Sequence, residues 1–321
     1  MKPLKYLFIS SMLFVATSCG NSWLDLEPST SVDTETSIKI LSDVEFTLNG
    51  IYSTMQSSDA YSGRLVYYGD VTGDDMQAVS STKRVANYYR FNFTKDDNPS
   101  SHWSYLYSII QNCNLILMNI DKLVIDEDDK AYRDDLKGEA LAIRGLALFD
   151  LTRIFGYPYL KDNGASLGVP IIEGLSTIDS KPTRNTVAQC YTKIIDDLTQ
   201  SLSLLGEKFN KGKINKWGAM VLLSRVYLYK GENANALKMA SDAIIGAEKN
   251  KYALWTNEDY PTAWGEDASA SKPGEVLFEI VNLTTDSPGK ESMGYLNSYD
   301  GYDDMCITCS FYQFLKEDPK D

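Results

Sequence analysis

Residues 138–160, GEALAIRGLALFDLTRIFGYPYL, decide the fold of this chain. Apolar side chains recur through them at steps of three and four, which is the periodicity of an amphipathic helix. The recurring positions are Leu136, Ala140, Ile143, Ala147, Leu151 and Ile154. Glycine and alanine share the same stretch, so a second helix can approach it closely. Gly156 and then Pro158 predict where this helix ends.

Further helical patterns lie on both sides of this stretch. Ser42-Asp43-Val44-Glu45 has the form of a capping box and predicts the start of a helix. Apolar periodicity predicts two more helices, one from His102 to Leu123 and one from Arg184 to Leu205. The chain is therefore expected to be built mainly from helices.

The segment from Lys213 to Lys249 predicts a helical hairpin with a repeat signature. Small, aromatic and alanine residues fall at the offsets of a tetratricopeptide repeat, namely Ser224, Tyr227, Gly231, Ala236, Ala240 and Ala243. The helix at Gly138 and the helix at Arg184 form a compatible second unit. Because stacked hairpins share one core, we expect a mostly α fold of tetratricopeptide-like helical hairpins with long irregular loops.

Two segments lack helical periodicity and are rich in Tyr, Gly and Asp. They run from Tyr61 to Ser101 and from Met293 to Asp304, and an apolar strand is predicted from Val276 to Val281. A non-repetitive stretch as long as the first is usually functional or disordered, and its aromatic residues argue against disorder. Tyrosine rings can stack on the C–H faces of sugars, while Asp and Asn can bind the hydroxyl groups.

The candidate ligand-binding residues therefore come from these two segments. They are Asp74, Asp75, Tyr88, Tyr89, Asn92, Tyr295, Tyr299, Asp300 and Tyr302. The alternative is that each tyrosine only packs its loop onto the helical core.

The composition excludes several classes of function. The 321 residues include 31 Lys and Arg against 44 Asp and Glu, a formal net charge of -13, so no basic patch is available for nucleic acid. His102 is the only histidine, which excludes a two-histidine metal motif, and we expect neither a metal nor a cofactor. Residues 206–213, GEKFNKGK, resemble a phosphate loop, but their glycines are one residue too far apart.

No catalytic residue is predicted. A carboxylate pair for glycoside hydrolysis stays open, because the spacing that matters there is spatial. Cys306 and Cys309 have redox or zinc spacing without a second pair, so a local disulfide or two free thiols is expected. Cys113 and Cys190 fall inside helical patterns and are expected in the core.

The first residues have the pattern of a bacterial lipoprotein signal. Lys2 and Lys5 precede an apolar run from Tyr6 to Val15, and small residues follow before Cys19. Cleavage before Cys19 would leave that residue lipidated, and the mature chain would be tethered to a membrane by lipid. The alternative is an ordinary secretory signal with a coincidental cysteine.

Several stretches resemble, in order and spacing, the SusD/RagB family of outer-membrane nutrient-binding lipoproteins. They are Cys19 followed by Trp23-Leu24-Asp25, Leu48-Asn-Gly-Ile-Tyr52, Gly73-Asp74-Asp75, Tyr107-x-x-Ile110-x-x-Cys113-Asn114, residues 138–158, Arg184-x-Thr-Val187 with Tyr191 and Asp197-Leu198, and Glu275 to Ile280. The resemblance implies the SusD-like α superhelical fold. It also implies a chain shorter than its relatives at the C-terminal side.

The resemblance further implies an organisation and a function. Residues 1–18 would be the signal peptide, 19–33 the lipidated tether, 34–250 the helical domain and 251–321 the start of a loop-rich region. The protein would be anchored on the outer membrane, facing the exterior. There it would bind a glycan or other nutrient and pass it to a SusC-like TonB-dependent transporter without catalysis. The alternative is an assembly scaffold whose helical repeats bind protein instead of ligand.

Overall fold

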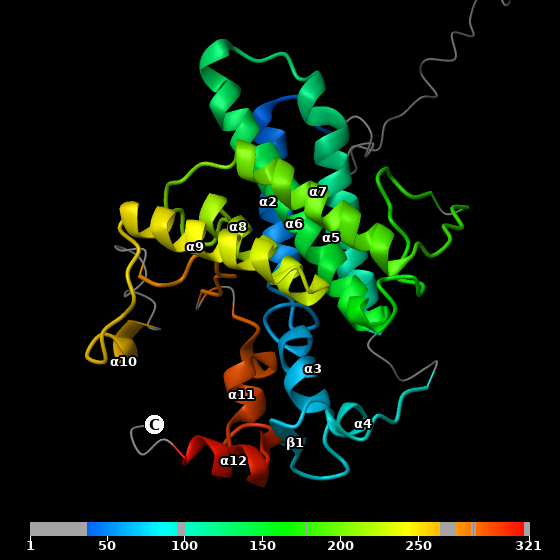
Figure 1. Ribbon diagram of the computed structural model, residues 1–321, viewed down its shortest axis with the longest axis vertical. Helices are drawn as coiled ribbons and strands as arrows, with labels where there is room; N and C mark the ends of the chain where they lie inside the picture. The colour runs from blue at the N-terminus through cyan, green and yellow to red at the C-terminus, as the bar shows by residue number, and fades with distance from the viewer. Residues whose placement is uncertain are drawn as a thin grey trace, which may run out of the picture. The chain divides into compact units, whose positions relative to one another are not determined.

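The computed structural model describes residues 37–94, 100–177, 179–263, 274–283, 285 and 287–317, shown in Figure 1. Its α-helices are α2 Leu41–Met55, α3 Arg64–Thr72, α4 Ala86–Tyr89, α5 Ser100–Asn119, α6 Lys130–Phe155, α7 Val187–Leu204, α8 Lys216–Lys230, α9 Asn233–Lys249, α10 Tyr260–Ala263, α11 Met293–Asn297 and α12 Cys309–Leu315. Short 3-10 turns are η3 Ile120–Lys122, η4 Glu127–Asp129, η5 Tyr159–Lys161 and η7 Gly289–Glu291. The described strands are β1 Met76–Ala78 and β2 Met305–Ile307. This confirms the mostly α-helical fold.

Helix α6, which contains the deciding stretch, lies at the centre of the helices. Every residue from Gly138 to Thr152 is buried, and α6 contacts α2, α5, α7 and α8. The helix ends at Phe155 with Gly156 as its C-cap, as predicted. The expectation of an amphipathic helix was wrong for this segment, because a helix packed on all sides has no solvent face.

Small residues let α7 approach α6 closely. A side chain on Gly145 would begin 3.0 Å from Cγ of Leu198 on α7, which is too near for ordinary contact. A buried polar network crosses the same interface. Arg144 Nε and Nη2 donate to the two carboxylate oxygens of Asp197 at 2.7 and 2.6 Å, and Nη1 donates to Oδ1 of Asn114 on α5 at 2.8 Å. The paired charges hold three helices in one register.

Helices α8 and α9 form the predicted hairpin, and they lie side by side in Figure 1. The Asn215 side chain caps α8 by accepting hydrogen bonds from the amides of Trp217 and Gly218. Gly231 ends the helix with a φ of +84°, a conformation in which a side chain would be strained. Ser224 Oγ donates to the carbonyl of Ala236 at 2.8 Å, joining the two helices.

Three local predictions were wrong. Helix α2 begins at Leu41, and Asp43 accepts hydrogen bonds from the amides of Lys39 and Ile40, so Asp43 caps the helix and the Ser42 capping box is not made. Residues 276–281 form no strand. Tyr61 to Ser101 is not uniformly irregular, because it contains α3, β1 and α4. These elements are short and lie among Gly and Asp residues, so their apolar periodicity was not recognised in the sequence.

The helix predicted from Arg184 begins three residues later, at Val187. Thr186 Oγ1 accepts from the amide of Gln189, and Gln189 Oε1 accepts from the amide of Thr186, which is a complete capping box. Arg184 precedes the helix and donates to the carbonyls of Gly168 and Phe155 at 2.5 and 2.7 Å. It fixes the loop that joins α6 to α7.

The predicted division at residue 250 stays a prediction. The signal peptide and tether, with Cys19, lie outside the described residues. Residues from Ile38 onward form one structural unit. Among the residues that the structure describes, no helix combines the length and apolar character that crossing a bilayer requires.

Candidate functional site

The two Tyr- and Asp-rich segments, far apart in the sequence, meet in a small antiparallel sheet. Strand β1 pairs with β2 so that Met76 faces Ile307 and Ala78 faces Met305. Thr308 extends the contact, since its amide donates to the carbonyl of Asp75 at 2.9 Å and its hydroxyl to that of Asp74 at 2.6 Å. The two segments that supplied all nine candidate residues therefore lie against each other at this sheet, and together we call them the loop face (residues 74–92 and 291–308).

A small apolar cluster, separate from the helical core, supports the loop face. Its buried members come from α3, the segment before α4, α11 and β2, and they are Tyr67, Val71, Val85, Leu296 and Met305. Figure 1 shows α3, α11 and β1 close together, in agreement with these contacts. Tyr88 packs against the cluster and is only partly exposed. Tyr88 therefore packs its loop against apolar residues, as the alternative interpretation of the tyrosines expected.

Arg84 joins the two halves of the loop face. Its guanidinium binds Asp304 at 2.9 Å and Glu291 at 3.0 Å, and it lies 4.2 Å from the ring centroid of Tyr302. Lys83 Nζ donates to the carbonyl of Tyr302 at 2.5 Å. Asp304 is buried, so its pairing with Arg84 satisfies a charge that would otherwise be costly to bury.

The other candidates lie on the outside of the loop face. Tyr299 is 89% exposed, and Tyr302 and Tyr89 are 39% and 38% exposed. Asp74, Asp75, Asn92 and Asp300 are also exposed, and Tyr295 is half-buried. The Tyr295 and Tyr302 rings meet edge to face with centroids 5.1 Å apart. Exposed rings beside carboxylate and amide groups can bind a sugar by stacking and hydrogen bonding.

Sequence reasoning missed an aromatic cluster that borders this face. Tyr68 on α3 contacts the rings of Tyr88, Phe93 and His102, with centroids 5.4, 6.5 and 5.6 Å apart. Burial lowers the pKa of His102 to about 4, so this imidazole is neutral at pH 7. Arg84 was also missed. The adjacent pair Lys83-Arg84 beside the aromatic run was a usable signal, but the acidic partners of Arg84 lie more than 200 residues away in the sequence.

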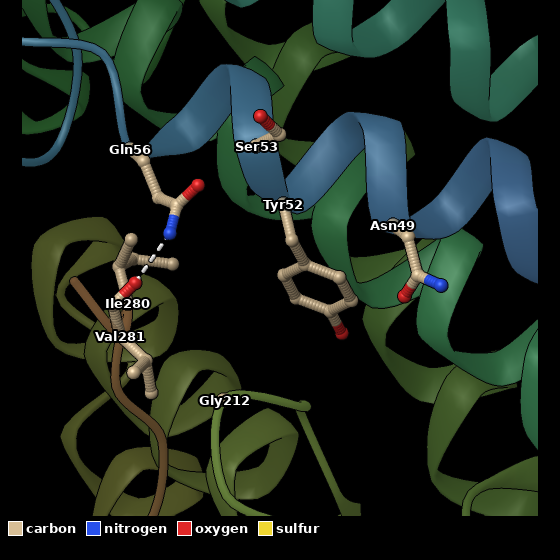
Figure 2. A pocket seen from close by; sticks show the side chains of 7 residues that line it. All are labelled: Asn49, Tyr52, Ser53, Gln56, Gly212, Ile280 and Val281. Carbon is tan, nitrogen blue, oxygen red and sulfur yellow. Dashed lines mark hydrogen bonds between the residues drawn. The ribbon is translucent and has the colours of Figure 1, made fainter. Parts of the chain in front are cut away.

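Three of the hollows among the described residues lie outside the loop face, and none of the nine candidates lines them. Figure 2 shows one, of about 270 Å³, where Gln56, the C-cap residue of α2, donates to the carbonyl of Val281 at 2.5 Å. The Tyr52 ring lines it too, and the Tyr52 hydroxyl donates to Glu139 at 2.6 Å. Glu139 lines a second hollow, of about 610 Å³, with Asp135 and Lys213. A third, of about 660 Å³, lies among α3, α6 and α8.

Glu139 is the described carboxyl with the most altered pKa. It is 5% exposed, and burial raises its pKa to about 7, against the lowering effect of the Tyr52 hydrogen bond and of Lys213. The group is positioned inside the helices and its oxygen already holds the Tyr52 hydroxyl. Glu139 therefore links α6 to α2 through this hydrogen bond.

The described residues include no cluster of three or more His, Cys, Asp or Glu side chains arranged to hold a metal ion. Cys306 and Cys309 are exposed free thiols, and Cys113 and Cys190 are buried, as expected for core residues. The exposed Tyr, Asp and Asn side chains of the loop face are suited to binding a ligand non-covalently, by ring stacking and hydrogen bonds.

Comparisons with known proteins agree with this geometry. A SusD-like family model, described as starch-binding and associating with the outer membrane, matches residues 22–228. The SusD-like protein P2 of Formosa agariphila is 28% identical over 313 residues, which cover 94% of this chain and 57% of that protein.

Solved structures share the fold. A candidate sugar-binding protein of Bacteroides vulgatus is 82% identical with a TM-score of 0.87, covering 89% of this chain and 64% of that one. A SusD superfamily protein of Bacteroides thetaiotaomicron is 37% identical with a TM-score of 0.79, covering 88% and 63%. The chain thus spans less than two thirds of the length of these relatives. On the family model and these identities together, the chain belongs to the SusD-like family.

Proposed function

We propose that this protein captures a glycan or related nutrient on its loop face and passes it, without chemistry, to a SusC-like TonB-dependent transporter. Lipid on Cys19 would hold it at the outer membrane, facing the exterior. The observation that carries the proposal is the β1–β2 pairing, which brings together two distant segments that both carry exposed tyrosines. Membership of the SusD-like family, whose model is described as starch-binding, supports it.

The chemistry of the loop face suits a neutral sugar chain. Tyr299 is nearly free of neighbouring atoms and offers both ring faces to a ligand. Tyr302 is fixed by Arg84 and by Tyr295, so it can bind without first losing conformational freedom. Asp300 and Asp75 are exposed acceptors for hydroxyl groups. Pre-positioned aromatic groups with polar neighbours are the usual composition of a sugar site.

The experiment is affinity-gel retardation of the mature protein by a panel of soluble polysaccharides. A SusD-like protein described as laminarin-binding has the same fold, with a TM-score of 0.71 at 20% identity, so laminarin belongs in the panel beside starch. We expect at least one glycan to retard the protein. The variant Tyr299→Ala/Tyr302→Ala should lose about 10-fold in affinity, since each aromatic contact is worth roughly 0.5–1.5 kcal/mol.

Tyr157→Ala is the matched control. This tyrosine is also exposed, but it follows α6 and lies outside the loop face. Retardation should be unchanged in this variant. If both variants bind every glycan like the wild type while co-purification with the transporter persists, the scaffold function replaces the binding function.

A further inference from the structure

The groove among α3, α6 and α8 holds two guanidinium groups side by side. Arg153 on α6 and Arg225 on α8 both line it. Arg153 lies 4.9 Å from the ring centroid of Phe149 and 5.3 Å from that of Tyr229, and Arg225 lies 6.0 Å from both. Two cations near the same pair of rings repel each other unless anions neutralise them.

The buried carboxylate in the groove, Asp150, forms an ion pair with only one of them, Arg153. It is 3% exposed, and its Oδ1 binds Nη2 of Arg153. Its Oδ2 accepts the hydroxyl of Tyr61 at 2.8 Å. Within the described part of the chain, Arg225 has neither a hydrogen bond nor an ion pair. Arg225 is exposed and has no acidic partner of its own among these residues, while the groove as a whole is lined by two arginines and two aspartates.

The walls of the groove carry the other groups that a sugar needs. Tyr229, one helical turn after Arg225, is 44% exposed. On the opposite wall α3 contributes Tyr68 and the exposed carboxylate of Asp70. An aromatic face, a hydroxyl acceptor and a free guanidinium thus line a volume of about 660 Å³, enough for a short oligosaccharide.

We propose that this groove is a second saccharide site, selective for a sugar unit that carries an anion, either a carboxylate or a sulfate. Arg225 binds the anion through its planar fork of N–H donors. Tyr229 packs against the ring of the same sugar unit, and Asp70 accepts its hydroxyl groups from the α3 wall. The proposal rests on the proposed function in one respect, that the ligand is a glycan, but it uses none of the loop-face residues.

The test is isothermal titration calorimetry of the mature protein with three trisaccharides. One is trigalacturonate, one is a sulfated galactose trisaccharide, and one is neutral laminaritriose. We expect at least one acidic trisaccharide to bind, and which of the two binds identifies the anion. The Arg225→Gln variant should bind it about 10- to 100-fold more weakly, because a hydrogen bond to a charged group is lost. Added salt should weaken acidic-sugar binding to the wild type in the same direction.

Lys238→Gln on α9 is the matched control for net charge, since Lys238 is exposed and lies outside the groove. It should leave acidic-sugar affinity unchanged. The proposal is overturned if neither acidic trisaccharide binds, or if Arg225→Gln and Lys238→Gln reduce affinity equally. The two proposals fail separately. Loss of neutral-glycan retardation only in Tyr299→Ala/Tyr302→Ala supports the loop face, whatever the acidic sugars do.

Discussion

Replacement of Glu139 by Gln should change how the stability of this protein depends on pH. Glu139 is buried between α6 and α2, where it accepts the Tyr52 hydroxyl at 2.6 Å. Burial raises its pKa from 4.5 to about 7, and the carboxylates of Asp135 and Glu45 add to the effect. A group whose pKa is raised on folding binds its proton more tightly in the folded state. It therefore stabilises the protein below pH 4.5, and this contribution is lost as pH rises through about 7.

The magnitude follows from the shift. The folded-state pKa lies about 2.5 units above the unfolded value, and each unit is worth 1.36 kcal/mol. The stabilisation lost between about pH 4.5 and pH 8 is thus about 3 kcal/mol. Glutamine stays neutral at every pH, and its oxygen can still accept the Tyr52 hydroxyl. The free energy of unfolding of Glu139→Gln should therefore rise by about 3 kcal/mol relative to wild type over this pH range.

The assay is urea unfolding followed by far-ultraviolet circular dichroism at several pH values. The quantity to plot is the free energy of unfolding of the variant minus that of the wild type. The buried His102, with its own lowered pKa, contributes equally to both proteins and cancels in this difference. Glu248→Gln, on the exposed face of α9, is the control and should give a flat difference. A flat difference for Glu139→Gln as well would refute the assignment of a raised pKa to Glu139.

Two further predictions concern packing and buried charge. Gly246→Ala should destabilise the protein by roughly 1–3 kcal/mol in the same unfolding assay, because the new methyl would lie 2.1 Å from the Trp217 ring. Gly50→Ala on α2 is the control, because its new methyl group meets nothing within 4 Å, and it should stabilise the helix by up to about 1 kcal/mol. Equal changes in the free energy of unfolding for Gly246→Ala and Gly50→Ala would contradict the packing argument. Arg144→Met should cost about 3 kcal/mol, because buried Asp197 loses both hydrogen bonds from Arg144 and keeps only Lys193 Nζ at 3.2 Å. Arg144→Met/Asp197→Leu should recover most of that loss. If the double variant is as unstable as the single one, the buried charge is not the cause.

The helices were predictable because their signals are local. Steps of three and four placed α6 and α7, and a glycine at the turn placed the α8–α9 hairpin. Complete burial of α6 was not predictable in this way. Its periodic positions looked like one face, whereas glycine and alanine on the other faces admit neighbouring helices, and Arg144 is satisfied by Asp197, more than 50 residues away.

The same distinction between local and long-range signals applies to the candidate site. Composition identified the two Tyr- and Asp-rich segments as places to look for sugar contacts, and their roles in binding remain predictions. Nothing local indicated that residues 76–78 would pair with residues 305–307, because each strand is only three residues long. The Arg84 contacts to Glu291 and Asp304 were hidden for the same reason. Such pairs arise only when the rest of the chain brings them together.

The β1–β2 pairing has a consequence for the order in which the protein assembles. It closes a loop of about 230 residues that contains every helix from α5 to α9. Closing so long a loop in an unfolded chain is entropically costly, whereas helical hairpins form from neighbouring residues. The hairpins can therefore form as soon as their own residues are available, and the small sheet can close only when residues 305–307 are available. A defect confined to that last segment would leave a well-folded helical body with an incomplete loop face.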